Sequence, residues 1–170
     1  MEFDESLTRA QYVYLAKLAG GSGRYDEMAR YMEKIIRTPS FKDFTAEERC
    51  LFSFAYKNFL GTRRSAWQVV FSMENEEEGR RKEANAALIK AYRAGIEAEL
   101  CSICGAVLGL LDSHLIPSAG SAESKVLYLR MKGDYHRYLA EFKVGEERKQ
   151  AARDTAAAYY AAQVVSVFWG

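Results

Sequence analysis

Two pairs of cationic residues, each with the same spacing, and one adjacent tyrosine indicate an anion-binding site. Lys57 and Arg64 lie seven residues apart, as do Arg130 and Arg137, and Tyr138 follows directly. In an α-helix seven residues make two turns, so each pair shares one face, about 10 Å apart along the axis. Arginine forks, a lysine charge and a tyrosine hydroxyl together suit a phosphate dianion. On spacing alone, the plainer interpretation, solvated faces of amphipathic helices, is favoured.

Other chemistries find less support in the residue pattern. The pair Cys101 and Cys104 has metal-site spacing, but it lies in an apolar helical run, and zinc would need two further ligands. Only Cys50, His114 and His136 are available for that, so we expect core thiols, no metal site and no cofactor. No nucleophile, acid or base constellation is present, and we therefore expect no enzyme.

Length and composition indicate one helical domain. Of 170 residues, 49% are hydrophobic and 28% charged, and only two are proline, which favours long helices over a turn-rich β-sandwich. Lys+Arg 24 against Asp+Glu 23 leaves no basic field for nucleic acid. The sequence has no run of eighteen apolar residues and no basic residues at its start, so we expect neither a membrane span nor a signal peptide. The three cysteines fit a reducing compartment. We expect a cytoplasmic location, with a nuclear one left open as well.

Hydrophobic periodicity predicts an all-α fold of long antiparallel helices. The predicted helices cover residues 4–19, 25 to the residue before Pro39, 45–78, 80–111, 121 or 124 to 142, and 146 onward. The first stripe comprises Leu7, Ala10, Tyr14 and Leu18, and residues 20–23, rich in glycine, are expected to end that helix. The third contains Phe52, Ala55, Phe59, Ala66, Val70 and Met73, and the fourth Ala87, Tyr92, Ile96, Leu100, Ile103, Val107 and Leu111. We expect a solvated acidic end at residues 74–78, a loop over 113–121 and an apolar tail over 164–170.

Longer motifs resemble the 14-3-3 family. They are Arg24-Tyr-Asp-Glu-Met28, Glu47-Glu48-Arg49, Ala55-Tyr-Lys-Asn58, Gly61-Thr-Arg-Arg-Ser-Ala-Trp67, Leu110-Leu-Asp-Ser-His-Leu-Ile-Pro117 and the stretch 124–142. The sequence from Asp134 to Lys143 is most similar to that of plant members. The resemblance covers residues 4 to about 163 in collinear order.

The resemblance implies a dimeric adaptor in signal transduction that binds phosphoserine or phosphothreonine segments of client proteins. It carries the phosphate cradle over to Lys57, Arg64, Arg137 and Tyr138, with Arg130 nearby. Its partners would be phosphorylated clients and a second subunit, the same chain or another 14-3-3 protein, with no nucleic acid and no membrane. The implied dimer contacts are Leu18, Arg24, Ala66, Val70, Met73, Tyr92 and Glu99.

Departures from the family pattern leave an alternative open. The family has nine helices and this chain supplies about six, so residues 1–170 are expected to form a single, incomplete domain. Within it, 1–111 would supply dimerisation and the first groove wall, 121–163 the cradle helix and its successor, and 164–170 a divergent tail. Gly20 to Gly23, Gly95, Ala84 and Gln11 alter the implied dimer contacts. The alternative is a shortened dimerisation partner of full-length relatives with weak or no phosphopeptide binding.

Overall fold

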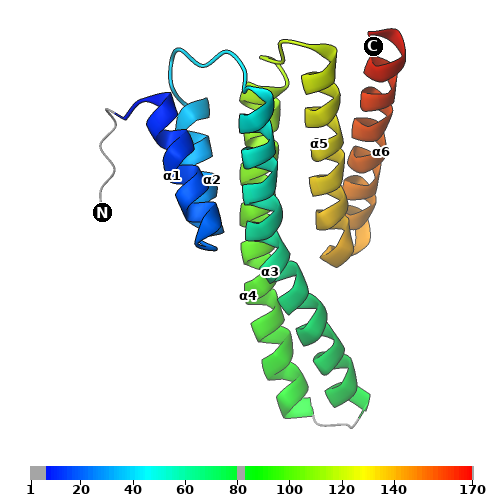
Figure 1. Cartoon of the computed structure of the whole chain (residues 1–170). Coiled ribbons are helices and arrows are strands. Elements are labelled where there is room, and N and C mark those ends of the chain that lie inside the picture. The colour runs from blue at the N-terminus through cyan, green and yellow to red at the C-terminus, as the bar shows by residue number, and fades with distance from the viewer. Residues whose placement is uncertain (1–6, 80–82, 170) are drawn as a thin grey trace.

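The computed structural model describes residues 7–79 and 83–169, and every regular element in these ranges is helical, as predicted. The elements are α1 (Arg9–Gly21), α2 (Tyr25–Ile36), α3 (Ala46–Gly79), α4 (Glu83–Leu110), the π-helical turn η1 (Leu111–Leu115), α5 (Ala122–Phe142) and α6 (Gly145–Phe168). Figure 1 shows α3 and α4 as a long central pair, with α1 and α2 on one side and α5 and α6 on the other. The far end of this central pair projects beyond the shorter helices.

Side-chain caps fix where the helices begin. The hydroxyl of Thr45 accepts the Glu48 amide at 3.2 Å while the Glu48 carboxylate accepts the Thr45 amide at 2.8 Å, which forms a reciprocal capping box where the third helix was predicted to begin. Ser121 caps α5 in the same way. The predicted start of the first helix at residue 4 is wrong for the part described, because Thr8 and Gln11 form a capping box and α1 begins at Arg9. Residues 4–6 lie outside the described range.

The turn between α1 and α2 depends on two glycines. Helix α1 ends at Gly21, two residues later than predicted, because Gly20 is helical and faces α2. A Cβ atom on Gly20 would lie 2.8 Å from the sulfur of Met28, so a larger residue here would require the end of the Met28 side chain to move. Gly23 then turns the chain with φ at +75°, a conformation that favours glycine.

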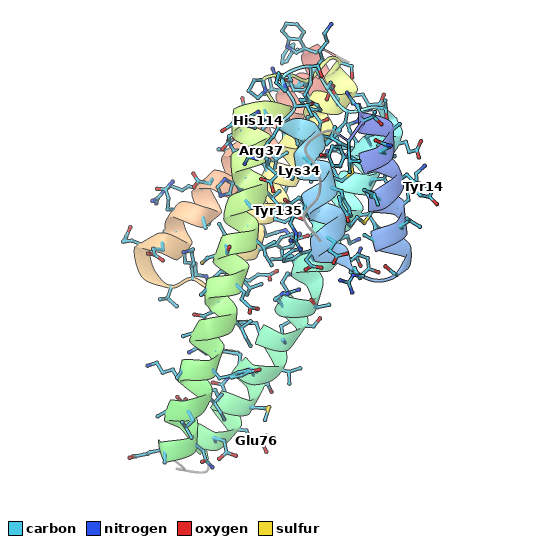
Figure 2. All side chains as sticks on the ribbon, turned by 90° about the vertical axis from the view of Figure 1, so that its left-hand side faces the viewer. Tyr14, Lys34, Arg37, Glu76, His114 and Tyr135 are labelled. Carbon is cyan, nitrogen blue, oxygen red and sulfur yellow. The ribbon has the colours of Figure 1, made fainter. Side chains whose placement is uncertain are left out.

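The core lies where α1 to α5 meet, and it covers only part of the predicted apolar stripes. In α3, Phe52 and Ala55 are buried, whereas Ala66 and Met73 are exposed. In α4 the stripe is buried from Ile96 onward, but Ala87 and Tyr92 are exposed. In α1, Tyr14 and Leu18 are exposed, and Tyr14 points outward from the helix (Figure 2). The buried residues of α1 are instead Tyr12, Ala16 and Ala19.

The projecting end of α3 and α4 is held by a polar network. Glu74 is buried and accepts hydrogen bonds from Arg93, which also donates to Glu97 at 2.5 Å. Trp67 donates its indole N–H to the same Glu97 at 2.9 Å. The interpretation of residues 74–78 as a solvated acidic end is therefore wrong for Glu74, because a cation from the facing helix meets it. Figure 2 shows the neighbouring Glu76 near the tip of this end.

Two further expectations are corrected by helical structure. The predicted loop over residues 113–121 begins later, because η1 continues α4 and buries both Leu111 and Leu115. The apolar tail is not separate from the preceding helix, since α6 runs on to Phe168. Its last three described residues, Val167, Phe168 and Trp169, are exposed. Residues 80–82 and 170, which belonged to the predicted fourth helix and tail, lie outside the described range.

The segment Glu83–Leu115 is long and apolar enough to cross a membrane by length and composition, with a mean hydropathy of 1.7 over its best window. The sequence analysis looked for uninterrupted apolar runs and so did not identify this segment, because Glu97 and Glu99 interrupt its apolar residues. Core helices of soluble proteins pass the same test. Here the segment packs along α3 and α5, with 39% of that window buried.

Candidate functional site

Helices α3 and α5 bring three of the five predicted anion-binding residues into contact. The Arg64 guanidinium lies 4.2 Å from the centre of the Tyr138 ring, and that of Arg137 lies 4.8 Å from it. Both are within cation–π range of the same ring. Arg64 comes from α3 and the other two from α5, so the contact depends on the packing of these two helices. The sequence spacing alone did not specify that packing.

One carboxylate engages both arginines. Arg64 donates to Glu141 through Nε at 3.0 Å and through Nη2 at 2.6 Å, a bidentate fork. Arg137 approaches the same carboxylate, with 3.8 Å between its Nη1 and Oε1 of Glu141. Both charges of the Arg64–Glu141 pair remain about one third exposed, so an anion from solvent can reach them. The site therefore already holds a planar anionic group of its own.

Helix α6 contributes a third element through Tyr159. Its hydroxyl donates to Asp134 at 2.5 Å and accepts the Nε–H of Arg137 at 3.4 Å. Burial raises the pKa of Tyr159, and the hydrogen bond to Asp134 raises it further, so the phenol stays protonated and acts as that donor. The bond to Tyr159 in turn raises the pKa of Arg137.

Lys57 and Arg130 lie at the edges of this cluster. Lys57 is exposed two turns before Arg64, and within residues 7–79 and 83–169 no carboxylate forms an ion pair with it. Arg130 is exposed too and borders two hollows, of about 540 Å³ and about 400 Å³. The first has an apolar floor that includes Val126, Leu127 and Met131. The structure thus places these two cations beside the three grouped residues without direct contact.

Sequence reasoning missed Glu141 and Tyr159. Glu141 follows Arg137 by four residues, which is one helical turn, so it could have been placed on the same face. Tyr159 belongs to another helix and is 22 residues away from Arg137. No spacing rule connects them, and only the pairing of α5 with α6 brings them together.

The residues predicted for a dimer interface leave much apolar surface exposed. Leu18, Met73 and Tyr92 are exposed and Val70 is half-buried, while Ala66 and Tyr92 border a hollow of about 580 Å³ between α3 and α4. The two predicted charged contacts have partners within the chain. Arg24 forms an ion pair with Glu27, and Glu99 lies 3.6 Å from Arg63.

Among the described residues, the thiols do not gather with other side chains that could bind a metal. Cys104 is buried, which raises its pKa to about 12, Cys101 is half-buried, and Cys50 is exposed. All three are free thiols, and among the residues described no three His, Cys, Asp or Glu side chains come together around a common point. The expectation that Cys101 and Cys104 are core thiols is thus met by Cys104 and in part by Cys101.

Comparison with protein families matches residues 15–167 to the model described as 14-3-3 protein. Similar proteins include 14-3-3-like protein GF14-C of Oryza sativa subsp. japonica, 56% identical over 161 residues, which covers 95% of this chain and 63% of the relative. The 14-3-3-like protein G-BOX factor 14 kappa of Arabidopsis thaliana is 57% identical over 164 residues, 95% of this chain and 66% of that protein. The 14-3-3-like protein D of Nicotiana tabacum is 52% identical over 167 residues, 98% and 67% respectively. The chain spans about two thirds of the length of these relatives.

Proposed function

The chain belongs to the 14-3-3 family, and we propose that it is a phosphoserine- and phosphothreonine-binding adaptor that acts by binding and not by catalysis. Its clients would be phosphorylated proteins in signal transduction. One observation carries it: two arginines from different helices converge on one anionic group beside a tyrosine.

The convergence supports phosphate recognition for a geometric reason. The fork by which Arg64 holds Glu141, with donor–acceptor distances of 3.0 and 2.6 Å, is the arrangement in which arginine also holds two phosphate oxygens. Arg137 lies close enough to the same carboxylate to share a dianion with Arg64. We propose that a phosphate replaces Glu141 in this position, with Tyr138 as a further hydrogen-bond donor.

The exposed cations at the edges receive secondary roles in this proposal. Lys57 would add a point charge to the phosphate from the same face of α3 as Arg64. Arg130 would contact the segment that carries the phosphate, since it borders the hollow with the apolar floor between α3 and α5. That floor suits an uncharged side chain next to the phosphorylated residue.

Binding of a peptide library with one fixed phosphoserine tests the proposal. We expect the 170-residue chain to retain phosphorylated members and to release the matched library in which serine replaces phosphoserine. The peptides retained then serve as labelled probes for fluorescence anisotropy. Equal retention of the two libraries would contradict the adaptor proposal and would leave the dimerisation partner as the better interpretation.

We also propose that the protein acts as a dimer through the exposed surface of α1, α3 and α4. Tyr92→Glu should shift the protein towards monomer, because a charge would then replace buried apolar area at that interface. Tyr160→Glu is a matched control, since both tyrosines are 69% exposed and Tyr160 lies on α6. Analytical ultracentrifugation at micromolar concentration measures the effect. A wild-type chain that sediments as a monomer would contradict the dimer.

A further inference from the structure

The hydroxyl of Tyr159 contacts the candidate site, although Tyr159 is not one of the predicted cradle residues and lies on a different helix from them. It comes from α6, whereas the other groups in contact come from α3 and α5. It bridges two side chains of α5, donating to Asp134 at 2.5 Å and accepting from Arg137 at 3.4 Å. The ring that carries this hydroxyl is half-buried between the two helices.

The backbone of α5 is shaped to receive this ring. A Cβ atom on Gly133 would lie 2.3 Å from the nearest ring carbon of Tyr159 and 2.4 Å from the next. Any side chain at this position would therefore push the tyrosine, and its hydroxyl, away from Asp134 and Arg137. Gly133 itself is buried in the middle of a helix, where glycine is less favourable than alanine. The close approach of the ring is the physical reason for that residue type.

The bond matters for Arg137 because the other contacts of this side chain are longer, including the 4.8 Å from its guanidinium to the centre of the Tyr138 ring. About half of it is exposed, and its remaining polar neighbours, Asp134 and Glu141, both lie at 3.8 Å. An arginine on a flexible stem loses side-chain entropy when it binds an anion. A hydrogen bond to its Nε–H reduces that loss and leaves the two terminal nitrogens for a ligand.

We propose that Tyr159 is a positioning residue of the phosphate site, which holds the Arg137 guanidinium by its Nε–H so that the terminal nitrogens meet the phosphate. The inference rests on the proposed function for its effect on binding, but the bond to Arg137 can be measured without any ligand. It makes α6 part of the binding machinery, beyond its packing against α5. Asp134 completes the arrangement by fixing the direction of the phenol.

The test compares Tyr159→Phe with Tyr160→Phe in the 170-residue chain. The first change removes only the hydroxyl and keeps the ring against Gly133. The second change also removes one tyrosine hydroxyl, but at an exposed residue without this contact. With the phosphoserine peptide selected from the library as probe, we expect Tyr159→Phe to weaken binding about fivefold, because the hydrogen bond that holds Arg137 is lost. Tyr160→Phe should leave the affinity unchanged. Circular dichroism checks that both variants keep their helices.

A double-mutant cycle separates positioning from a purely structural role. In the background of Arg137→Lys, which keeps the charge but has no Nε–H, Tyr159→Phe should have less than half of its effect on affinity. Additive effects, or no effect of Tyr159→Phe in the wild-type background, would overturn the inference.

The ligand-free measurement is the NMR signal of the Arg137 Nε–H group. It should shift and exchange faster with water in Tyr159→Phe than in Tyr160→Phe. An unchanged signal would overturn the inference whatever the peptide does. If the wild-type chain binds no phosphopeptide but the signal moves as expected, the adaptor proposal fails while the bond from Tyr159 to Arg137 stands.

Discussion

Two arginine–carboxylate pairs use the same chemistry in two regions of the molecule. In the candidate site, Arg64 and Glu141 are 29% and 33% exposed. At the projecting end, Arg93 and Glu74 are 18% and 6% exposed, and Glu97 adds a second carboxylate. This difference in exposure gives the two pairs different roles. Water and anions reach the first pair, whereas the second is largely buried between α3 and α4.

The physical reason lies in desolvation. A pair that remains partly in water is worth about 0 to 1 kcal/mol, so it can open at little cost. Removal of one member of a buried pair leaves the other charge without a partner, which costs about 3 to 5 kcal/mol. We therefore expect changes at the candidate site to alter binding and changes at the projecting end to alter stability. Four measurements test this difference between the two regions.

The largest effect is expected from charge reversal in the site. Arg64→Glu, and likewise Lys57→Glu, should weaken phosphopeptide binding by about 2–4 kcal/mol, because charge-assisted bonds are lost and repulsion is added. Helicity by circular dichroism should be unchanged. Arg30→Glu on α2 introduces the same charge at an exposed position and is the control. Retention of wild-type affinity by both site variants would place the phosphate elsewhere.

The next effect is on stability at the projecting end. Arg93→Ala should lower the free energy of unfolding by about 3 kcal/mol, since Glu74 would stay buried without its cation. Urea denaturation measures the loss. Arg37→Ala, which removes an exposed partner of Glu33, should cost less than about 1 kcal/mol. Equal losses in the two variants would remove burial as the distinguishing factor.

A second buried carboxylate, Glu48, adds a pH dependence to the contrast. Glu48 joins α3 to α1, and although its burial favours the neutral acid, hydrogen bonds from Arg9 and Thr45 outweigh this and hold its pKa below 4.5. A lowered folded-state pKa contributes stability that is present above pH 4.5 and is lost as the pH falls through the folded value. Glu48→Gln should therefore unfold with less dependence on pH than the wild type between about pH 6 and pH 3. Glu146→Gln is the exposed control, and parallel profiles for all three proteins would count against the argument.

The smallest effect is expected at the carboxylate that occupies the site. Glu141→Gln should tighten phosphopeptide binding about two- to fivefold, because an incoming phosphate no longer displaces a charged group that holds Arg64. Its stability in urea should differ little from that of the wild type. Glu147→Gln, an exposed change of equal charge, controls for the net charge of the protein. Weaker binding of Glu141→Gln would mean that the carboxylate orients Arg64 more than it competes.

What the sequence could predict here was local. The predicted helix starts at residue 45 and at residue 121, the first of the two positions left open for α5, agree with the caps at Thr45 and Ser121, which are contacts three residues apart. The apolar face of α3 was also predicted, but periodicity does not say what covers a face. Met73 fits the stripe as well as Phe52 does, yet Met73 is exposed because α3 extends beyond the helices that cover Phe52.

Contacts between helices could not be predicted from the sequence either. Glu74 belongs to a run of acidic residues that normally indicates a solvated end, and only the register of α4 against α3 brings Arg93 to it. Tyr159 meets Arg137 because α6 returns along α5. The motifs that resembled the family did identify the chain, since they are longer than any periodic pattern, and the family match bears this out.

The π-helical turn after α4 has a consequence for how the chain tolerates changes in length. The amide of Ile116 donates to the carbonyl of Leu111 at 2.8 Å, five residues back, so the turn holds one residue more than an α-helix needs. A one-residue deletion elsewhere in α4 would rotate everything after it by about 100° and expose the core face. Within residues 112–114 the same deletion would leave Leu115 three positions after Leu111, still on the same side of the helix. This turn is therefore the place in α4 and its extension where a lost residue disturbs the core least.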